Sequence, residues 1–131
     1  MGPYEIVVSA ENNAWLEWQA MLFHHSCIRR LARAPIIVVH GDDALREGYR
    51  LIEATGGRIQ RAPSFRSLPG DDYPPRNSAG TLACVDTDAA YILLCDPDMI
   101  FLRDEDFSSL QLHPGEVSAD RSNFLRVNSE N

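Results

Sequence analysis

The chain has 131 residues, a size typical of one domain with its own hydrophobic core. Apolar residues make up 44% and charged residues 24%, which excludes wholesale disorder, and a net charge of −7 without a dense Lys/Arg cluster argues against nucleic-acid binding. No apolar run approaches the roughly 18 residues of a membrane helix and no basic leader precedes the first apolar run, so we expect a cytoplasmic protein without a membrane span.

The first predicted elements are a strand and a helix. Residues 4–10 hold a run of β-branched residues, which is typical of a strand. Apolar residues then recur at helical spacing from Ala14, which predicts a helix that ends near Ala34, because a proline comes next. We expect Trp15 and Trp18 to widen the packing face of this helix.

Two further strands and a helix follow. Residues 36–40 form an apolar run without polar alternation, as in a strand buried on both faces of a parallel sheet. The Gly-Asp-Asp segment at residues 41–43 breaks this run and begins a helix that continues to about Ala54. The glycine pair at residues 56–57 ends that helix, and residues 58–61 predict a short third strand.

The second half of the chain is less regular. Residues 62–76 contain four prolines and predict a surface loop. Residues 77–86 predict a short helix, and residues 91–95 form the second strongly apolar strand. Residues 117–119 are expected to add one more strand.

Alternating strands and helices predict an α/β fold, a Rossmann-like and mostly parallel sheet with helices on both faces. We expect one domain over residues 1–127 and a flexible tail over residues 128–131. In such sheets ligands bind at the carboxyl ends of the strands. Three polar clusters fall at predicted strand ends, at residues 9–13, 41–43 and 96–98.

Asp96 and Asp98 are the best candidates for a metal site. In an extended chain these two side chains point to the same side while Pro97 points away, so one ion could lie between them. Mg²⁺ and Mn²⁺ prefer oxygen ligands and commonly bind through one or two protein carboxylates while phosphates complete the shell. Asp-x-Asp also arises by chance in an acidic chain, as at residues 86–88, but only Asp96 and Asp98 directly follow an apolar strand.

The segment from Tyr91 to Leu102, YILLCDPDMIFL, resembles the DxD segment of GT-A-fold glycosyltransferases, in which an apolar strand ends in acid-x-acid and continues with an apolar triplet. Pro75-Arg76-Asn77 and the helix after it are similar to the corresponding region of the hydroxyproline O-arabinosyltransferase and peptidyl-serine galactosyltransferase group. The resemblance implies transfer of a sugar from a nucleotide sugar to a hydroxyl acceptor. A UDP-sugar is the first candidate for the donor. Mn²⁺ or Mg²⁺ would help the diphosphate to depart.

The resemblance also implies roles for individual residues. Asp98 would be the direct metal ligand, and Asp96 would hold the metal shell or the ribose. Ser9, Ala10 and Glu11, at the exit of the first strand, would face the base and the ribose.

Two polar residues before the last helix are further candidates. Arg76 could contact the diphosphate, because a guanidinium holds phosphate oxygens through two hydrogen bonds, and an ion pair with Asp71 or Asp72 explains Arg76 equally well. Asn77 is interpreted first as the N-cap of the helix, whose N-terminus could assist an anion. His40 could touch the nucleotide, although a hydrogen-bonded structural histidine is more frequent.

Other functions stay open at this point. A GT-A enzyme continues well beyond its DxD strand into an acceptor half, and the resemblance covers only the N-terminal, nucleotide-binding half. We therefore expect either a fragment of a larger glycosyltransferase or a small relative whose site is completed by a second copy or another protein. The alternative is a non-catalytic nucleotide-binding or protein-interaction module with the same fold. Asp96 or Asp98 could also accept a phosphoryl group, although the partnered Lys and Ser/Thr expected downstream are missing. An unpaired sheet edge or an uncovered apolar face would favour a homo-oligomer.

The three cysteines are predicted to be ordinary core residues. Cys27, Cys84 and Cys95 show no Cys-x-x-Cys spacing, and each lies among apolar neighbours. We therefore expect reduced thiols that pack in the interior.

Overall fold

The structure is a computed structural model that describes residues 4–108 and 112–118. It confirms the predicted α/β fold, because parallel strands alternate with helices along the chain. The elements are β1 (Tyr4–Glu11), α1 (Ala14–Leu31), β2 (Ile36–His40), α2 (Glu47–Ala54), β3 (Arg58–Ala62), β4 (Ser67–Leu68), β5 (Asp71–Asp72), α3 (Arg76–Cys84) and β6 (Tyr91–Cys95).

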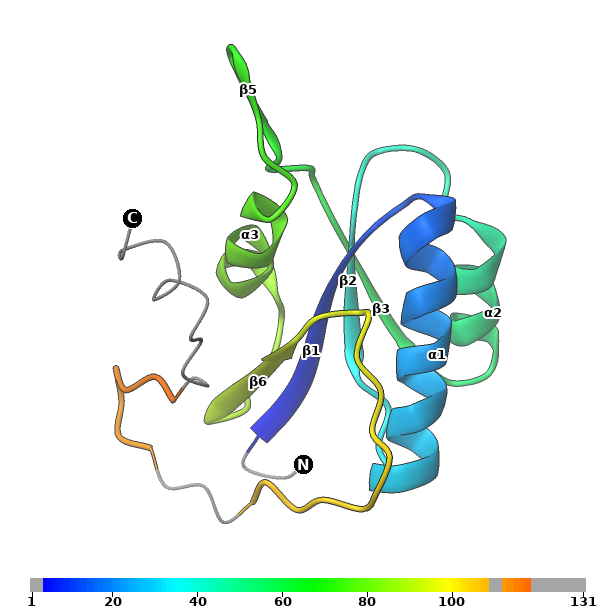
Figure 1. Cartoon of the computed structure of the whole chain (residues 1–131), viewed down its shortest axis with the longest axis vertical. Coiled ribbons are helices and arrows are strands. Elements are labelled where there is room, and N and C mark those ends of the chain that lie inside the picture. The colour runs from blue at the N-terminus through cyan, green and yellow to red at the C-terminus, as the bar shows by residue number, and fades with distance from the viewer. Residues whose placement is uncertain (1–3, 109–111, 119–131) are drawn as a thin grey trace, which may run out of the picture.

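The main sheet has four parallel strands in the order β3-β2-β1-β6. Val8 of β1 lies opposite Ile37 of β2 and Cys95 of β6, so β1 is an interior strand. The chain moves outward from β1 through β2 to β3 and then returns to place β6 on the other side of β1 (Figure 1). The topological switch point, where ligands bind in such sheets, therefore lies between β1 and β6.

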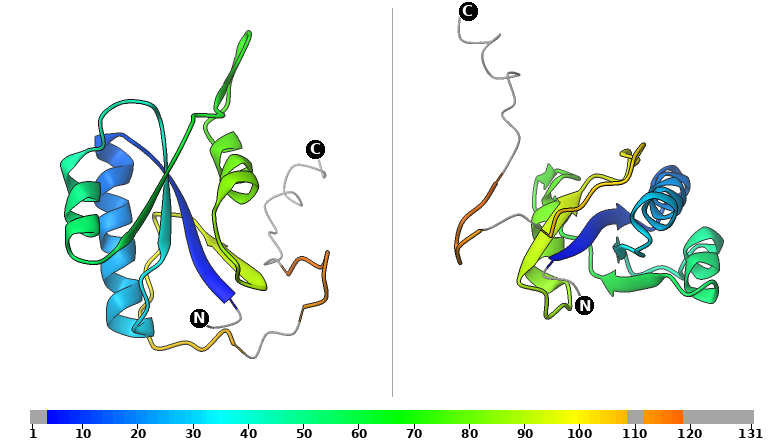
Figure 2. Two further views of the ribbon diagram at one scale, coloured as in Figure 1. Left: turned by 180° about the vertical axis from the view of Figure 1, so that it is seen from behind. Right: turned by 90° about the horizontal axis from the view of Figure 1, so that it is seen from below.

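One face of the sheet is covered by α1 and α2 (Figure 2). Ile6 of β1, Phe23 and Cys27 of α1 and Tyr49 of α2 belong to one apolar cluster, and each is completely buried. Burial of an aromatic or aliphatic side chain contributes roughly 1.5 to 3 kcal/mol, so this cluster is the main source of stability.

The opposite face is covered by α3 and has a smaller apolar cluster, which includes Val7 and Val38. Polar contacts supplement it. The carboxylate of Glu5 is buried on β1 and pairs with Arg58 of β3, and Arg58 also donates to the carbonyl oxygen of Ala34 at 2.5 Å. Burial of an unpaired carboxylate costs on the order of several kcal/mol of stability, so the buried Glu5 needs the ion pair with Arg58.

Several predicted boundaries move by a few residues. Helix α1 ends at Leu31 instead of near Ala34, because Ala32 adopts a left-handed conformation with φ of 49°. Helix α2 begins at Glu47 instead of directly after residues 41–43, and α3 spans Arg76–Cys84 instead of residues 77–86.

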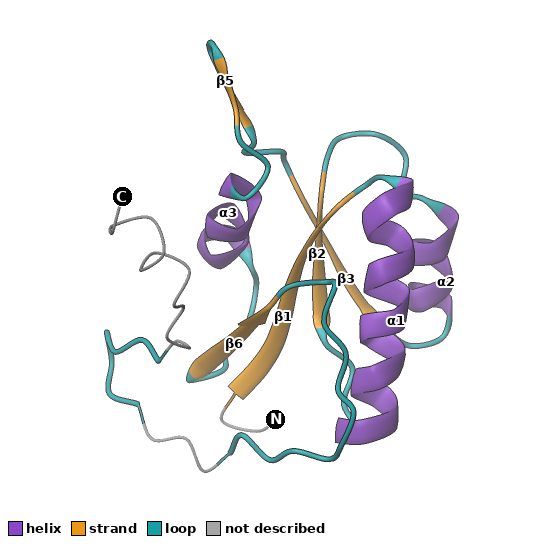
Figure 3. Ribbon diagram, viewed as in Figure 1, coloured by secondary structure: helices purple, strands orange, loops and turns teal. Residues whose placement is uncertain are grey.

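The predicted loop over residues 62–76 contains a short hairpin. Strands β4 and β5 pair antiparallel around Pro69-Gly70, and Gly70 has the positive φ of 78° that this two-residue turn requires. Figure 3 shows this hairpin projecting away from the main sheet, beyond the carboxyl end of β1. Two-residue strands carry little sequence signal, which is why the hairpin was not predicted.

The packing role predicted for two tryptophans is wrong. Trp15 and Trp18 are 68% and 46% exposed, and they contact each other edge to face with ring centroids 5.6 Å apart. The buried stripe of α1 is narrower than expected and runs through Ala20, Phe23 and Cys27.

The cysteine prediction is correct for two residues and wrong for one. Cys27 and Cys95 are buried free thiols, and burial raises their pKa values to about 12 and about 11, so both stay protonated. Cys84 is exposed because it is the last residue of α3, and the chain turns away from the helix at Val85.

The last predicted elements lie at the end of the described chain. Val117 and Ser118 are irregular, not strand, and pair with no strand among the described residues. Ala119 of that predicted strand, the end of the predicted domain at residue 127 and the predicted tail over residues 128–131 lie outside the described residues.

Candidate functional site

A cavity of about 170 Å³ lies at the switch point between β1 and β6. Four segments supply its walls: the end of β1, the first turn of α1, the start of α3 with the two prolines before it, and the turn after β6. Of the predicted site residues, the cavity brings together five, namely Ser9, Ala10, Glu11, Asn77 and Asp96. Leu16, Pro74, Pro75, Ser78 and Pro97 complete the lining.

The end of β1 is held firmly in this cavity, which we call the crevice. The hydroxyl of Tyr49 donates to the carbonyl oxygen of Glu11 at 2.7 Å, and this fixes the backbone of the strand end from the α2 side. Asn13 caps α1 by accepting a hydrogen bond from the backbone N–H of Leu16 at 2.9 Å. The end of the strand and the start of the helix are therefore both held by side-chain hydrogen bonds, as a preorganised binding site requires.

The carboxylate of Glu11 is held by three hydrogen bonds at the crevice. It accepts them from Arg66 Nη1 at 2.8 Å and from the side-chain amides of Asn13 and Asn77 at 3.2 Å each. The side chain is only 15% exposed, so these donors replace most of its contact with water.

Asn77 does not cap α3, and the N-cap prediction is wrong. The helix starts one residue earlier, at Arg76, with Pro75 in the capping position. Asn77 is 3% exposed and points its side chain toward the crevice, where Oδ1 accepts from the backbone N–H of Phe65 at 2.7 Å and Nδ2 donates to Glu11. Asn77 therefore joins the segment before the hairpin to the end of β1.

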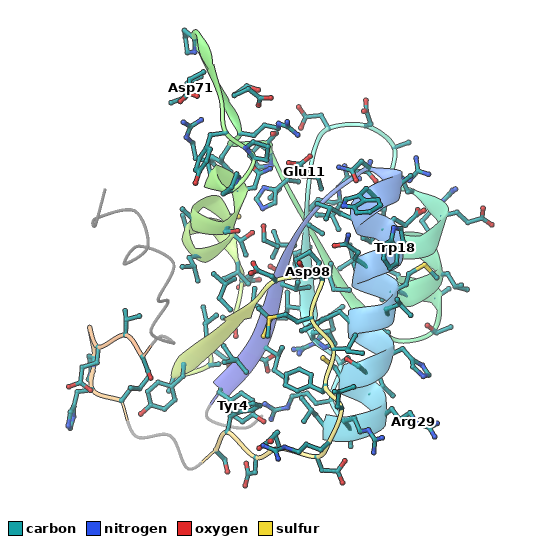
Figure 4. The ribbon with its side chains drawn as sticks, viewed as in Figure 1. Tyr4, Glu11, Trp18, Arg29, Asp71 and Asp98 are labelled. Atoms are coloured by element: carbon teal, nitrogen blue, oxygen red, sulfur yellow. The ribbon has the colours of Figure 1, made fainter. Side chains whose placement is uncertain are left out.

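Asp96 and Asp98 do not lie in extended chain as predicted. A turn over residues 96–99 is closed by a hydrogen bond from the N–H of Met99 to the carbonyl oxygen of Asp96 at 3.2 Å, and proline is favoured at the second position of such turns. Asp96 lines the crevice, whereas Asp98 is outside its lining, and both are exposed. Figure 4 shows Asp98 away from Glu11.

Of the two predicted metal ligands, only Asp96 lines the crevice. Among the described residues, no three His, Cys, Asp or Glu side chains gather in a group that could hold a metal ion. A hard cation that binds together with a diphosphate needs only one or two protein carboxylates, so the two exposed aspartates fit that mode of binding.

Arg76 lies at the base of the hairpin. Its guanidinium donates to Asp71 Oδ2 and to the carbonyl oxygen of Arg66, both at 2.6 Å, which is the ion-pair alternative considered for this residue. Figure 4 shows Asp71 on the projecting hairpin, well beyond Glu11.

Arg66 was missed by sequence reasoning, although it pairs with Glu11 of the crevice. It donates to Asp72 through Nε and Nη2 at 2.8 and 2.9 Å while Nη1 reaches Glu11. The hydrogen bond from Arg66 lowers the pKa of Asp72, so the pair stays ionised at neutral pH. An arginine and an aspartate on either side of Pro69-Gly70, each within three residues of it, are the signal that could have indicated an ion pair across a hairpin.

His40 is a structural histidine in this fold. It is 2% exposed, and its Nδ1 lies 2.8 Å from the carbonyl oxygen of Pro63 while Nε2 lies 2.6 Å from Thr81 Oγ1. A carbonyl oxygen only accepts, so Nδ1 carries a proton, and in the neutral ring Nε2 accepts from the hydroxyl of Thr81. This contact ties α3 to the end of β2 and leaves the ring no free nitrogen for a nucleotide.

No protein-family model, curated protein or solved structure matches the chain. In the part of the chain that the structure describes, no helix is long and apolar enough to cross a membrane. Function therefore has to be inferred from the geometry of the crevice.

Proposed function

We propose that the domain binds a nucleotide sugar, a UDP-sugar before others, in the crevice between β1 and β6 and acts as a glycosyltransferase-like domain. One observation supports this most directly. Five residues selected from the sequence for a nucleotide-sugar site come from three distant segments and line one cavity at the switch point. Ligands of open parallel sheets bind at this position.

The polar groups of the crevice suit a ribose and a diphosphate. Ser9 and Asn77 offer neutral hydrogen-bonding groups, while Asp96 places a carboxylate at its β6 side. A divalent cation, Mn²⁺ or Mg²⁺, bound beside Asp96 would neutralise charge on the departing diphosphate. Asp98 follows two residues later on the same turn and would serve as the second protein ligand of the cation once a diphosphate is present.

The second candidate is a non-catalytic nucleotide-binding module. The size of the crevice favours the non-catalytic module. The crevice volume of about 170 Å³ is below the roughly 300 Å³ of the smallest typical ligand pockets. Such a volume leaves little room for a sugar donor and an acceptor together. Both candidates bind the nucleotide, but only the glycosyltransferase also transfers the sugar.

Calorimetric titration with UDP and with GDP, each with and without Mn²⁺, tests the binding step. We expect UDP to bind more tightly with Mn²⁺, and Asp96→Asn to abolish this metal-dependent increase. Asp88→Asn is the matched control, because Asp88 is an exposed aspartate from the rival Asp-Thr-Asp sequence and is not part of the crevice. Equal binding by wild type and Asp96→Asn would contradict the proposal.

Release of UDP from UDP-sugars by the same preparations separates the two candidates. Metal-dependent release that Asp96→Asn removes would support a transferase. Binding without release, over hours and across several UDP-sugars, would favour the non-catalytic module.

A further inference from the structure

A second cavity adjoins the crevice at the carboxyl edge of the sheet. It also measures about 170 Å³ and lies over the ends of β1 and β2, where Asn12, His40, Gly41 and Ser64 line it. Glu11 lines both cavities, so its side chain stands between them. Neither cavity alone reaches the roughly 300 Å³ of a typical ligand pocket, whereas the two together do. A ligand that fills both must pass Glu11.

Glu11, which lines both cavities, is paired with Arg66, which lines neither of them. Arg66 Nη1 donates to Glu11 Oε2 at 2.8 Å, and this ion pair joins the base of the hairpin to the end of β1. The carboxylate does not depend on Arg66 alone, because Asn13 and Asn77 also donate to it. Glu11 therefore keeps two hydrogen-bond donors if Arg66 changes partner.

The guanidinium of Arg66 is oriented from its other side. Asp72 accepts from Nε and Nη2, which leaves Nη1 directed at Glu11. The arginine is held by a partner on its own hairpin, and its Nη1 group contacts one carboxylate oxygen of Glu11, the residue that lines both cavities. Arginine binds carboxylate and phosphate oxygens with the same planar geometry, so a phosphate can take the place of that oxygen.

We propose that Arg66 is the diphosphate-binding arginine of this domain, and that Glu11 occupies its Nη1 group until the ligand binds. On binding, Nη1 exchanges Glu11 Oε2 for a phosphate oxygen, while Asp72 keeps the guanidinium in place. Arg76, the arginine expected from the sequence, is directed instead at Asp71 and at the backbone of Arg66. This inference rests on the proposed function, because it identifies the anion-binding residue of the same site.

The exchange gives Glu11 and Arg66 opposite effects on affinity. Arg66→Gln removes the charge that meets the phosphates, so UDP with Mn²⁺ should bind about tenfold or more weakly, as expected for one charge-assisted hydrogen bond. Glu11→Gln removes the competing carboxylate and its repulsion of the diphosphate, so UDP should bind several-fold more tightly. Uridine, which has no phosphate, should show neither effect.

Calorimetric titration of UDP with Mn²⁺ and of uridine into wild type and four variants tests this. Arg103→Gln is the matched control, because Arg103 is an exposed arginine paired with Glu105 on another part of the chain. Arg76→Gln tests the rival arginine. Glu11→Gln keeps the shape of the side chain and leaves the pair of Arg66 with Asp72 intact, so it reports on the exchange even if Arg66→Gln disturbs the hairpin.

The outcomes separate this inference from the proposed function. If UDP binds wild type more tightly with Mn²⁺ and Asp96→Asn loses this increase, but Arg66→Gln binds normally or Glu11→Gln binds more weakly, the exchange is wrong and the nucleotide site stands. Loss of binding in Arg76→Gln with Arg66→Gln unaffected would overturn it in favour of the rival. If wild type binds neither UDP nor GDP with Mn²⁺, the proposed function fails and this inference fails with it.

Discussion

The two faces of the main sheet are held in different ways. On the α1/α2 face, large apolar side chains such as Phe23 and Tyr49 are completely buried in one cluster. On the α3 face the apolar cluster is smaller, and directed polar contacts add to it, among them Glu5 with Arg58 and Thr81 with His40.

This difference explains where a site can form. Apolar packing is non-directional and stabilises without fixing the position of any one polar atom. Hydrogen bonds between buried groups fix geometry, and those of α3 hold Asn77 against Glu11 at the crevice. The apolar face therefore provides most of the stability and fixes the site through the Tyr49 hydroxyl, whereas the polar face positions the side chains of Asn77 and Glu11.

The largest expected effect is on the apolar face. Phe23→Ala removes a completely buried ring and leaves a cavity, which should lower the free energy of unfolding by about 3 to 5 kcal/mol. Phe23→Leu fills more of the space and should cost clearly less. Urea unfolding followed by circular dichroism measures both. A loss below about 1 kcal/mol for Phe23→Ala would mean that this face is not the main core.

A smaller effect is expected on the α3 face. Thr81→Val keeps the shape of a completely buried side chain but leaves Nε2 of His40 without a donor, which should cost about 1 to 3 kcal/mol. Thr81→Ser retains the hydroxyl and should keep the hydrogen bond. The ¹⁵N chemical shifts of the His40 ring report it directly, because they should change in Thr81→Val and stay near wild type in Thr81→Ser. Unchanged shifts in Thr81→Val would show that this contact does not hold α3.

The same division determines how much could be predicted from the sequence. The runs at residues 4–10, 36–40 and 91–95 depend on local apolar pattern, and the structure has strands at all three. The position of the cavity followed from the order of the strands, which brought Ser9, Asn77 and Asp96 together.

The contacts within the site could not be predicted in the same way. Arg66 meets Glu11 across 55 residues of sequence, and no local pattern encodes such a pair. The turn at Asp96-Pro97-Asp98 depends on how the chain leaves the sheet, so the extended geometry assumed for the two aspartates was wrong. Exposure of Trp15 and Trp18 was missed for a related reason, because spacing identifies a helix but not how wide its buried stripe is.

His24 gives the smallest effect and the sharpest test of the comparison, because it is a polar group on the apolar side. Its Nδ1 is the single buried side-chain nitrogen or oxygen without a hydrogen-bond partner among the described residues, whereas His40, near the crevice, has both ring nitrogens bonded. Burial, with a smaller contribution from the charge of His25, lowers the pKa of His24 below its ordinary value of 6.5. The unfolded chain therefore binds a proton at His24 at a higher pH than the folded chain does. Below pH 6.5 this favours unfolding, so His24 should destabilise the domain progressively as the pH falls toward its folded pKa and have no such effect above pH 7.

His24→Gln, which cannot titrate, should unfold with a shallower dependence on pH between 5 and 6.5 than wild type, measured by urea unfolding at matched ionic strength. His25→Gln is the control, because His25 is exposed and adjacent in sequence, and it should change the slope less. Equal slopes for wild type and His24→Gln would mean that His24 reaches water or a partner in solution. The apolar face would then be less tightly closed around α1 than its buried side chains indicate, and the contrast between the two faces would be correspondingly weaker.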